Sequence, residues 1–132
     1  MKITPDTNIL VRAIMGDEPR QSKIAQAELA KADMIALTLP AICELVWVLS
    51  RGYKVPSPEI GIAVRRLLNS LNVVVNRPAA EAGLSLLEAG GDFADGVIAY
   101  EGNWLGADAF VSFDKKAVKL MESQGASARL LT

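Results

Sequence analysis

Residues 34–50 read MIALTLPAICELVWVLS, and this stretch decides the fold. It is the most apolar part of the chain, and its only charged residue is Glu44. Residues 34–38 predict a buried strand, and Pro40 suits the first turn of a following helix that Gly52 ends. An ionised carboxylate in an apolar interior is costly without a partner. Glu44 is therefore expected to reach an edge of the fold, to pair with a cation or to face a metal.

The alternation of strand and helix continues on both sides of this stretch. Short apolar segments predict strands over residues 2–5, 34–38, 73–75, 109–112 and 128–131. Segments with helical periodicity predict helices over residues 9–14, 20–32, 40–51, 59–71, 78–89, 92–104 and 114–123. Gly16 is expected to end the first helix, Thr38 or Leu39 to lie near the cap of the third, and Ser57 to cap the fourth. This order indicates an α/β fold: a single domain over residues 1–132, with a mostly parallel central sheet of about five strands flanked by helices.

The composition excludes several kinds of catalytic site. The 132 residues include no histidine and one cysteine, Cys43. Without histidine the chain lacks the usual general acid and base, the Ser-His and Cys-His pairs, and zinc sites that contain histidine. Any catalysis must therefore use carboxylates, lysine, hydroxyls or a metal held by oxygen atoms. Cys43 lies in an apolar helix and is expected to be buried and inert.

Charge and hydropathy give expectations about location and partners. No uncharged apolar run approaches the roughly 20 residues of a membrane span, and the lone cysteine fits a reducing cytoplasm. The net charge of −1, from 14 basic and 15 acidic residues, is typical of a solvated surface of mixed charge. If four of the acids bound a metal, the net charge of the remaining Lys, Arg, Asp and Glu residues would be positive. A basic rim could then form from Arg12, Arg51, Lys54, Arg65, Arg66, Lys115, Lys116 and Lys119.

Four acids lie close to the predicted carboxyl ends of strands or to helix starts. Asp6 and Asp114 follow strands, Glu44 lies one turn into a helix, and Asp95 lies in the first turn of another. The carboxyl ends of parallel strands form the functional crevice of an open sheet, so we expect these side chains to converge. Each acid also fits a helix N-terminus, where negative charge is favourable. A cap is the simpler interpretation of Asp92 and of Asp114.

Converging carboxylates repel one another unless a cation neutralises them. The helix neighbours of Glu44 are apolar, and no basic residue lies within reach of Asp95 along its helix. Because only oxygen donors are present, the cation is expected to be Mg²⁺ or Mn²⁺. Such clusters serve phosphodiester hydrolysis, in which the metal activates water and offsets charge in the transition state.

Four blocks of sequence together resemble the PIN domain, and more narrowly the VapC-type toxins of toxin–antitoxin pairs. The blocks are DTN after the first strand, CELVWVLSRGY around Glu44, DFADGVIA at residues 92–99 and VSFDK at residues 111–115. The resemblance implies a metal-dependent endoribonuclease, often cutting structured RNA such as tRNA, that a VapB-like antitoxin holds inactive. It implies Asp6, Glu44, Asp95 and Asp114 as metal-binding catalytic acids, with Asn8 and Ser112 in support.

Two residues depart from the pattern of this family. Pro5 precedes Asp6 and lacks a backbone donor, so the first strand is expected to end early or to shift Asp6. Gly96 stands where alanine is usual, which weakens a helix by roughly 1 kcal/mol.

Two other functions compete with the nuclease. An acid-cluster phosphatase with Asp6 as nucleophile would need a second Asp at the position of Asn8, and a non-catalytic PIN-like binding module would not need all four acids.

Trp47 and Trp104 can stack on bases, although packing is the commoner role of a helical tryptophan. Arg12 can hold a phosphate or pair with an acid. Surplus apolar helix surface at residues 8–14, 24–32 and 60–71 predicts a homodimer and an antitoxin groove.

Overall fold

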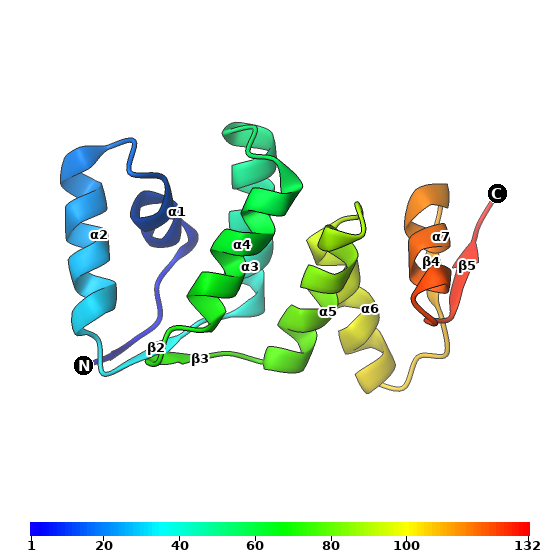
Figure 1. Ribbon diagram of the computed structural model, residues 1–132. Helices are drawn as coiled ribbons and strands as arrows, with labels where there is room; N and C mark the ends of the chain where they lie inside the picture. The colour runs from blue at the N-terminus through cyan, green and yellow to red at the C-terminus, as the bar shows by residue number, and fades with distance from the viewer. The chain divides into compact units, whose positions relative to one another are not determined.

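The computed structural model describes residues 1–132. The chain divides into two compact units, Met1–Asn76 and Arg77–Thr132 (Figure 1). Each unit has its own parallel strands and its own helices. The longest helix has 13 residues, and none of the helices is long and apolar enough to cross a membrane.

Unit 1 contains a three-stranded parallel sheet and four α-helices. The strands are β1 (Lys2–Ile3), β2 (Met34–Ala36) and β3 (Val73–Val74), with β2 in the centre. The helices are α1 (Thr7–Met15), α2 (Pro19–Lys31), α3 (Leu39–Trp47) and α4 (Ser57–Leu68). In Figure 1, α1 packs beside α2. The fully buried side chains of Leu10, Ile42, Leu45, Ile60 and Val64 form the core.

Local sequence signals set most element ends in unit 1. Gly16 ends α1 in the left-handed conformation, with φ of 67°. The hydroxyl of Thr38 caps α3 by accepting a hydrogen bond from the Ala41 amide at 3.3 Å. Ser57, expected to be a cap, is instead the first residue of α4, and no side chain caps that helix. β1 ends at Ile3, before Pro5, so the prediction of an early strand end is confirmed.

The helix that carries Glu44 changes its winding after Trp47. Residues Val48–Gly52 form a π-helical turn, η1, that continues α3. The Tyr53 amide donates to the Val48 carbonyl oxygen five residues earlier at 3.2 Å, and such turns are frequent at functional sites. The sequence predicts one continuous helix to about Arg51, and the π-helical form is a difference that the apolar periodicity does not indicate.

Unit 2 contains α5 (Arg77–Glu88), α6 (Phe93–Trp104), β4 (Phe110–Ser112), α7 (Lys115–Ser123) and β5 (Ala128–Leu130). β4 pairs with β5 in parallel. Helices α5 and α6 pack face to face, because Gly83 and Gly96 leave room at the crossing. A Cβ atom on Gly96 would lie 2.5 Å from the Ala82 carbonyl oxygen, and one on Gly83 would lie 2.7 Å from the ring of Phe93.

The predicted α/β class with parallel strands is confirmed, whereas the predicted single sheet is not. Hydrogen bonds join the strands into a sheet of three and a sheet of two. Every strand is only two or three residues long. Strands this short form few hydrogen bonds with a neighbouring strand. The apolar runs in the sequence therefore predict where the strands lie, but not which strands pair with one another.

Candidate metal centre

Asp6 combines a position after a strand with a role as helix cap. It follows β1 and precedes α1, and its Oδ1 accepts a hydrogen bond from the Ile9 amide at 3.1 Å. The side chain is exposed, while the preceding Pro5 is buried and fixes the approach of the chain. The cap bond holds the carboxylate in one orientation and leaves its second oxygen open. Asn8 is exposed in the first turn of α1.

Glu44 lies on the solvent side of α3. Its neighbours Leu45 and Val46 are buried, whereas Glu44 is exposed. Of the three expectations for this acid, reaching the edge of the fold is therefore the one confirmed. Cys43, expected to be buried, is half-buried.

In unit 2, two acids act on the carboxyl group of a third, Asp95. Asp92 caps α6 by accepting from the Ala94 amide at 2.9 Å. Asp95 follows in the first turn of α6 and is half-buried. Burial raises the pKa of the Asp95 carboxyl above its ordinary value, and the negative charges of Asp92 and Asp114 raise it further. The interpretation of Asp92 as a helix cap is confirmed.

Both the side chain and the backbone amide of Asp114 form hydrogen bonds. Its Oδ1 accepts from the amides of Lys116 at 3.0 Å and Ala117 at 3.2 Å, which caps α7. Its own amide donates to the Ser112 hydroxyl at 2.9 Å. Ser112, the last residue of β4, thus shapes the turn that presents Asp114.

These acids have the donor chemistry that a hard divalent cation prefers. All offer carboxylate oxygens, and the caps at Asp6 and Asp114 use Oδ1 alone. Asp6 and Glu44 belong to unit 1, and Asp95 and Asp114 to unit 2. The structure brings Asp95 under the influence of Asp92 and Asp114, and it contains no group of three or more acidic side chains already arranged for a metal.

Sequence reasoning missed a hydrogen-bond network at the far end of α1. Arg12 donates to the Gln21 side chain at 2.9 Å, to Asp17 at 3.4 Å and to the Tyr53 hydroxyl at 3.2 Å. Tyr53 in turn donates to Asp17 at 2.8 Å. Of the two roles considered for Arg12, pairing with an acid is therefore the observed one. The partner Tyr53 lies 41 positions away, so no local pattern could have identified it.

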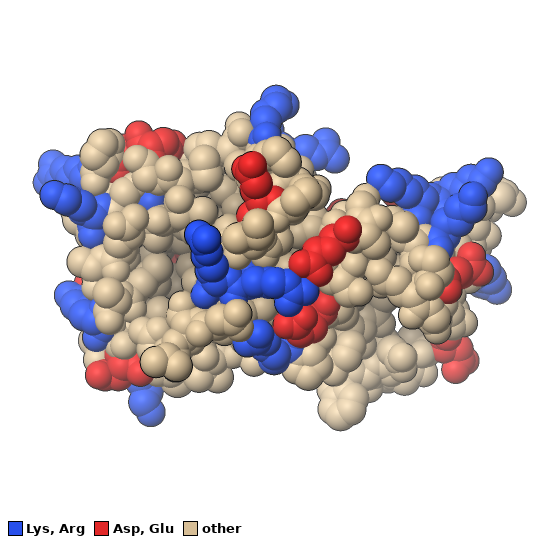
Figure 2. Space-filling model, in the orientation of Figure 1, with Lys and Arg blue, Asp and Glu red and all other residues tan.

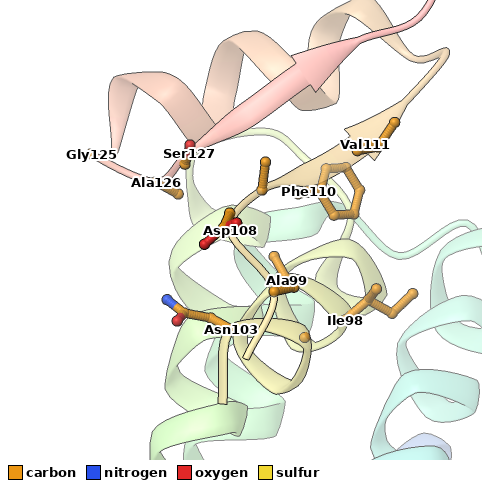
Figure 3. A pocket seen from close by; sticks show the side chains of 12 residues that line it. Ile98, Ala99, Asn103, Asp108, Phe110, Val111, Gly125, Ala126 and Ser127 are labelled. Carbon is orange, nitrogen blue, oxygen red and sulfur yellow. The ribbon is translucent and has the colours of Figure 1, made fainter. Parts of the chain in front are cut away.

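A cavity with a volume of about 460 Å³ lies elsewhere in unit 2. Figure 3 shows Ile98 and Phe110 along one side and Asn103 and Asp108 along another. None of the four predicted acids lines it. It lies beside the loops that lead into β4 and β5, at the amino ends of these strands, whereas functional crevices of parallel sheets lie at the carboxyl ends.

Basic side chains gather over α7 (Figure 2), the helix that Asp114 caps. This helix carries exposed Lys115, Lys116 and Lys119. Elsewhere on the face shown, basic and acidic side chains are interspersed. Three of the eight residues of the predicted basic rim thus lie exposed on one helix, and the rim as a whole stays a prediction.

Fold and acids together define an α/β protein with carboxylates after parallel strands, in the first turn of a helix and on the solvent side of α3. Residues 3–121 match the PIN domain, and the chain belongs to this family. PIN domains are generally nucleases and usually use divalent metals, and the family therefore suggests a nucleic-acid substrate. No curated protein matches the chain significantly.

Proposed function

We propose that this protein is a Mg²⁺- or Mn²⁺-dependent endoribonuclease, the VapC-type toxin of a toxin–antitoxin pair. The observation that carries the proposal is the PIN match over residues 3–121, which contains all four predicted acids. Asp6, Glu44, Asp95 and Asp114 are the proposed catalytic metal-binding residues of a single domain over residues 1–132. The cytoplasm is its proposed location.

The local environment of each acid supports this assignment. The caps orient Asp6 and Asp114 and leave a second oxygen free to bind a cation. Glu44 is exposed and accessible to a ligand. Asp95 is half-buried with a raised pKa, so a divalent cation would relieve the cost of its ionised form. When bound, the metal would offset charge on a phosphate and lower the pKa of a water molecule.

Asn8 and Ser112 are the proposed supporting residues. The Ser112 hydroxyl oxygen accepts a hydrogen bond from the Asp114 amide and so positions the turn that presents this acid. Asn8 is assigned this role because it lies two residues past Asp6 and is exposed in the first turn of α1.

The proposed partners are RNA, a VapB-like antitoxin and a second copy of the chain. Ile24 on α2 and Ile62 on α4 are 57% and 53% exposed, and a protein partner that covered them would gain from burying their apolar surface. Sedimentation of the purified protein tests the homodimer. A mass that stays monomeric at every concentration would remove this part of the proposal.

Glu44→Gln tests the nuclease most directly, because it keeps the size of an exposed side chain and removes its charge. Wild-type protein is expected to cleave RNA with Mg²⁺ or Mn²⁺ and to stop in EDTA. The variant should lose at least about 10- to 100-fold in rate, because losing even a residue that only orients a metal ligand costs that much. Glu101→Gln, at an exposed acid of α6, is the matched control and should retain full activity. Folded, metal-loaded wild-type protein that leaves varied RNAs intact would disprove the nuclease.

A further inference from the structure

Trp47 exposes a large aromatic surface on the solvent face of α3. Its side chain is 64% exposed, although an indole gains more from burial than most side chains do. Its neighbours along this face are also exposed: Glu44 one turn earlier and Arg51 one turn later. The sequence favours packing as the role of Trp47, and the core of unit 1 does not use it.

The surroundings of Trp47 distinguish between two kinds of partner. A dry protein interface needs contiguous apolar surface and is depleted of charge at its centre. Here the indole is flanked along the helix by a carboxylate and a guanidinium. An aromatic platform with a nearby cation is the arrangement that binds single-stranded nucleic acid, because bases stack on the ring and phosphates contact the cation.

We propose that Trp47 is a substrate-binding residue on which a nucleobase of the RNA stacks, with Arg51 contacting the adjoining backbone. This inference rests on the proposed nuclease. Glu44 and Trp47 are three residues apart in α3, which places them about 4.5 Å apart along the helix axis. If an RNA phosphate binds near Glu44, the base of the adjoining nucleotide is then within reach of the Trp47 indole.

Trp104 provides an internal comparison. It is 82% exposed at the end of α6. It lies nine residues beyond Asp95, about 13 Å along that helix. It is too far along its helix to accept a base from a nucleotide whose phosphate is bound at Asp95.

Tryptophan fluorescence can report on Trp47 and Trp104 individually, because replacing either one by Phe leaves a single tryptophan in the protein. The probe is a short single-stranded RNA in Ca²⁺ buffer, with a gel to verify that it stays intact. In Trp104→Phe, where Trp47 is the only tryptophan, added RNA is expected to quench the tryptophan fluorescence until it saturates. In Trp47→Phe, where only Trp104 emits, no such quenching is expected. Unchanged Trp47 emission, or equal quenching of both residues, would overturn the proposal. Emission of Trp47 that changes with protein concentration without RNA would assign this face to a second copy instead.

Kinetics test the same role independently. Trp47→Ala should raise KM roughly 5- to 100-fold, the range found for loss of one stacked base, with kcat largely retained. Cleavage by wild-type protein with KM unchanged in Trp47→Ala would refute stacking and leave the nuclease intact. Quenching of Trp47 by RNA without any cleavage would refute the nuclease and leave stacking intact.

Discussion

The carboxyl group of Asp95 holds its proton to higher pH in the folded protein than in the unfolded chain, because its pKa is raised. Burial is the main cause, and the charges of Asp92 and Asp114 add to it. Between the ordinary pKa and the raised one, the folded state binds more protons. The free energy of unfolding therefore falls as pH rises through this acid window. Above the window, ionised Asp95 destabilises the metal-free protein.

Asp95→Asn is accordingly expected to raise the melting temperature in EDTA at neutral pH and to flatten the fall in stability across the acid window. Mn²⁺ should raise the melting temperature of wild-type protein and not that of the variant. Thermal melts over a pH series measure both effects. Asp108→Asn, at an exposed acid in the same unit, serves as control and should behave as wild type. A lower melting temperature for Asp95→Asn in EDTA would contradict the expected direction of the effect.

Gly96 is the second residue whose role the structure explains. The missing Cβ lets α6 approach α5, because a methyl group there would lie 2.5 Å from the Ala82 carbonyl oxygen. Gly96→Ala should therefore destabilise the protein by about 1–3 kcal/mol through overpacking. Gly102→Ala in the same helix is the matched control, since its Cβ would meet only Ala107 at 4.0 Å. That change should be neutral or stabilising by up to about 1 kcal/mol. Equal effects in urea denaturation would show that the crossing tolerates a methyl group.

At the scale of elements, one tyrosine connects α1 with the segment that follows η1. Tyr53 accepts a hydrogen bond from Arg12 and donates one to Asp17. Tyr53→Phe keeps the ring and removes both bonds. A loss of about 1 kcal/mol in unfolding free energy is expected, because the bonds join charged groups that are partly exposed to water. Tyr100→Phe, at a half-buried tyrosine of α6, should change the unfolding free energy by less. Denaturant titrations that give the same loss for both variants would show that the network adds no stability.

Elements were predictable from the sequence where the signal is local. Gly16, Thr38 and Asp92 end or begin helices as expected, since capping involves residues only a few positions apart. The early end of β1 follows from Pro5 for the same reason. The position of Ser112 beside Asp114 was also recoverable, because the two lie two residues apart.

What escaped prediction depends on contacts between distant segments. The sheet partners, the link from Arg12 to Tyr53 and the close crossing at Gly96 each join segments far apart in sequence or on different elements. The exposure of Trp47 escaped for a related reason, and that of Glu44 was only one of three expectations. An apolar run shows that a helix packs, whereas which face packs depends on its neighbours in space.

At the scale of the whole molecule, the proposed site draws on both units. Asp6 and Glu44 lie in unit 1, and Asp95 and Asp114 in unit 2. Each pair alone offers few ligands for a cation that prefers about six oxygens, some from water. The proposal of one metal held by all four acids therefore requires ligands from both units.

Paramagnetic Mn²⁺ tests this requirement, since it broadens the NMR signals of nearby amides. At low Mn²⁺ occupancy, broadening is expected together at the start of α1, along α3 near Glu44, at the start of α6 and at the start of α7. Mg²⁺, which is diamagnetic, should compete with Mn²⁺ and restore the signals. Glu44→Gln should weaken the broadening in unit 2 as well as in unit 1, because both units share one ion. Broadening confined to Asp95 and Asp114, and unaffected by Glu44→Gln, would mean that unit 2 binds metal alone and that the four acids do not form one centre.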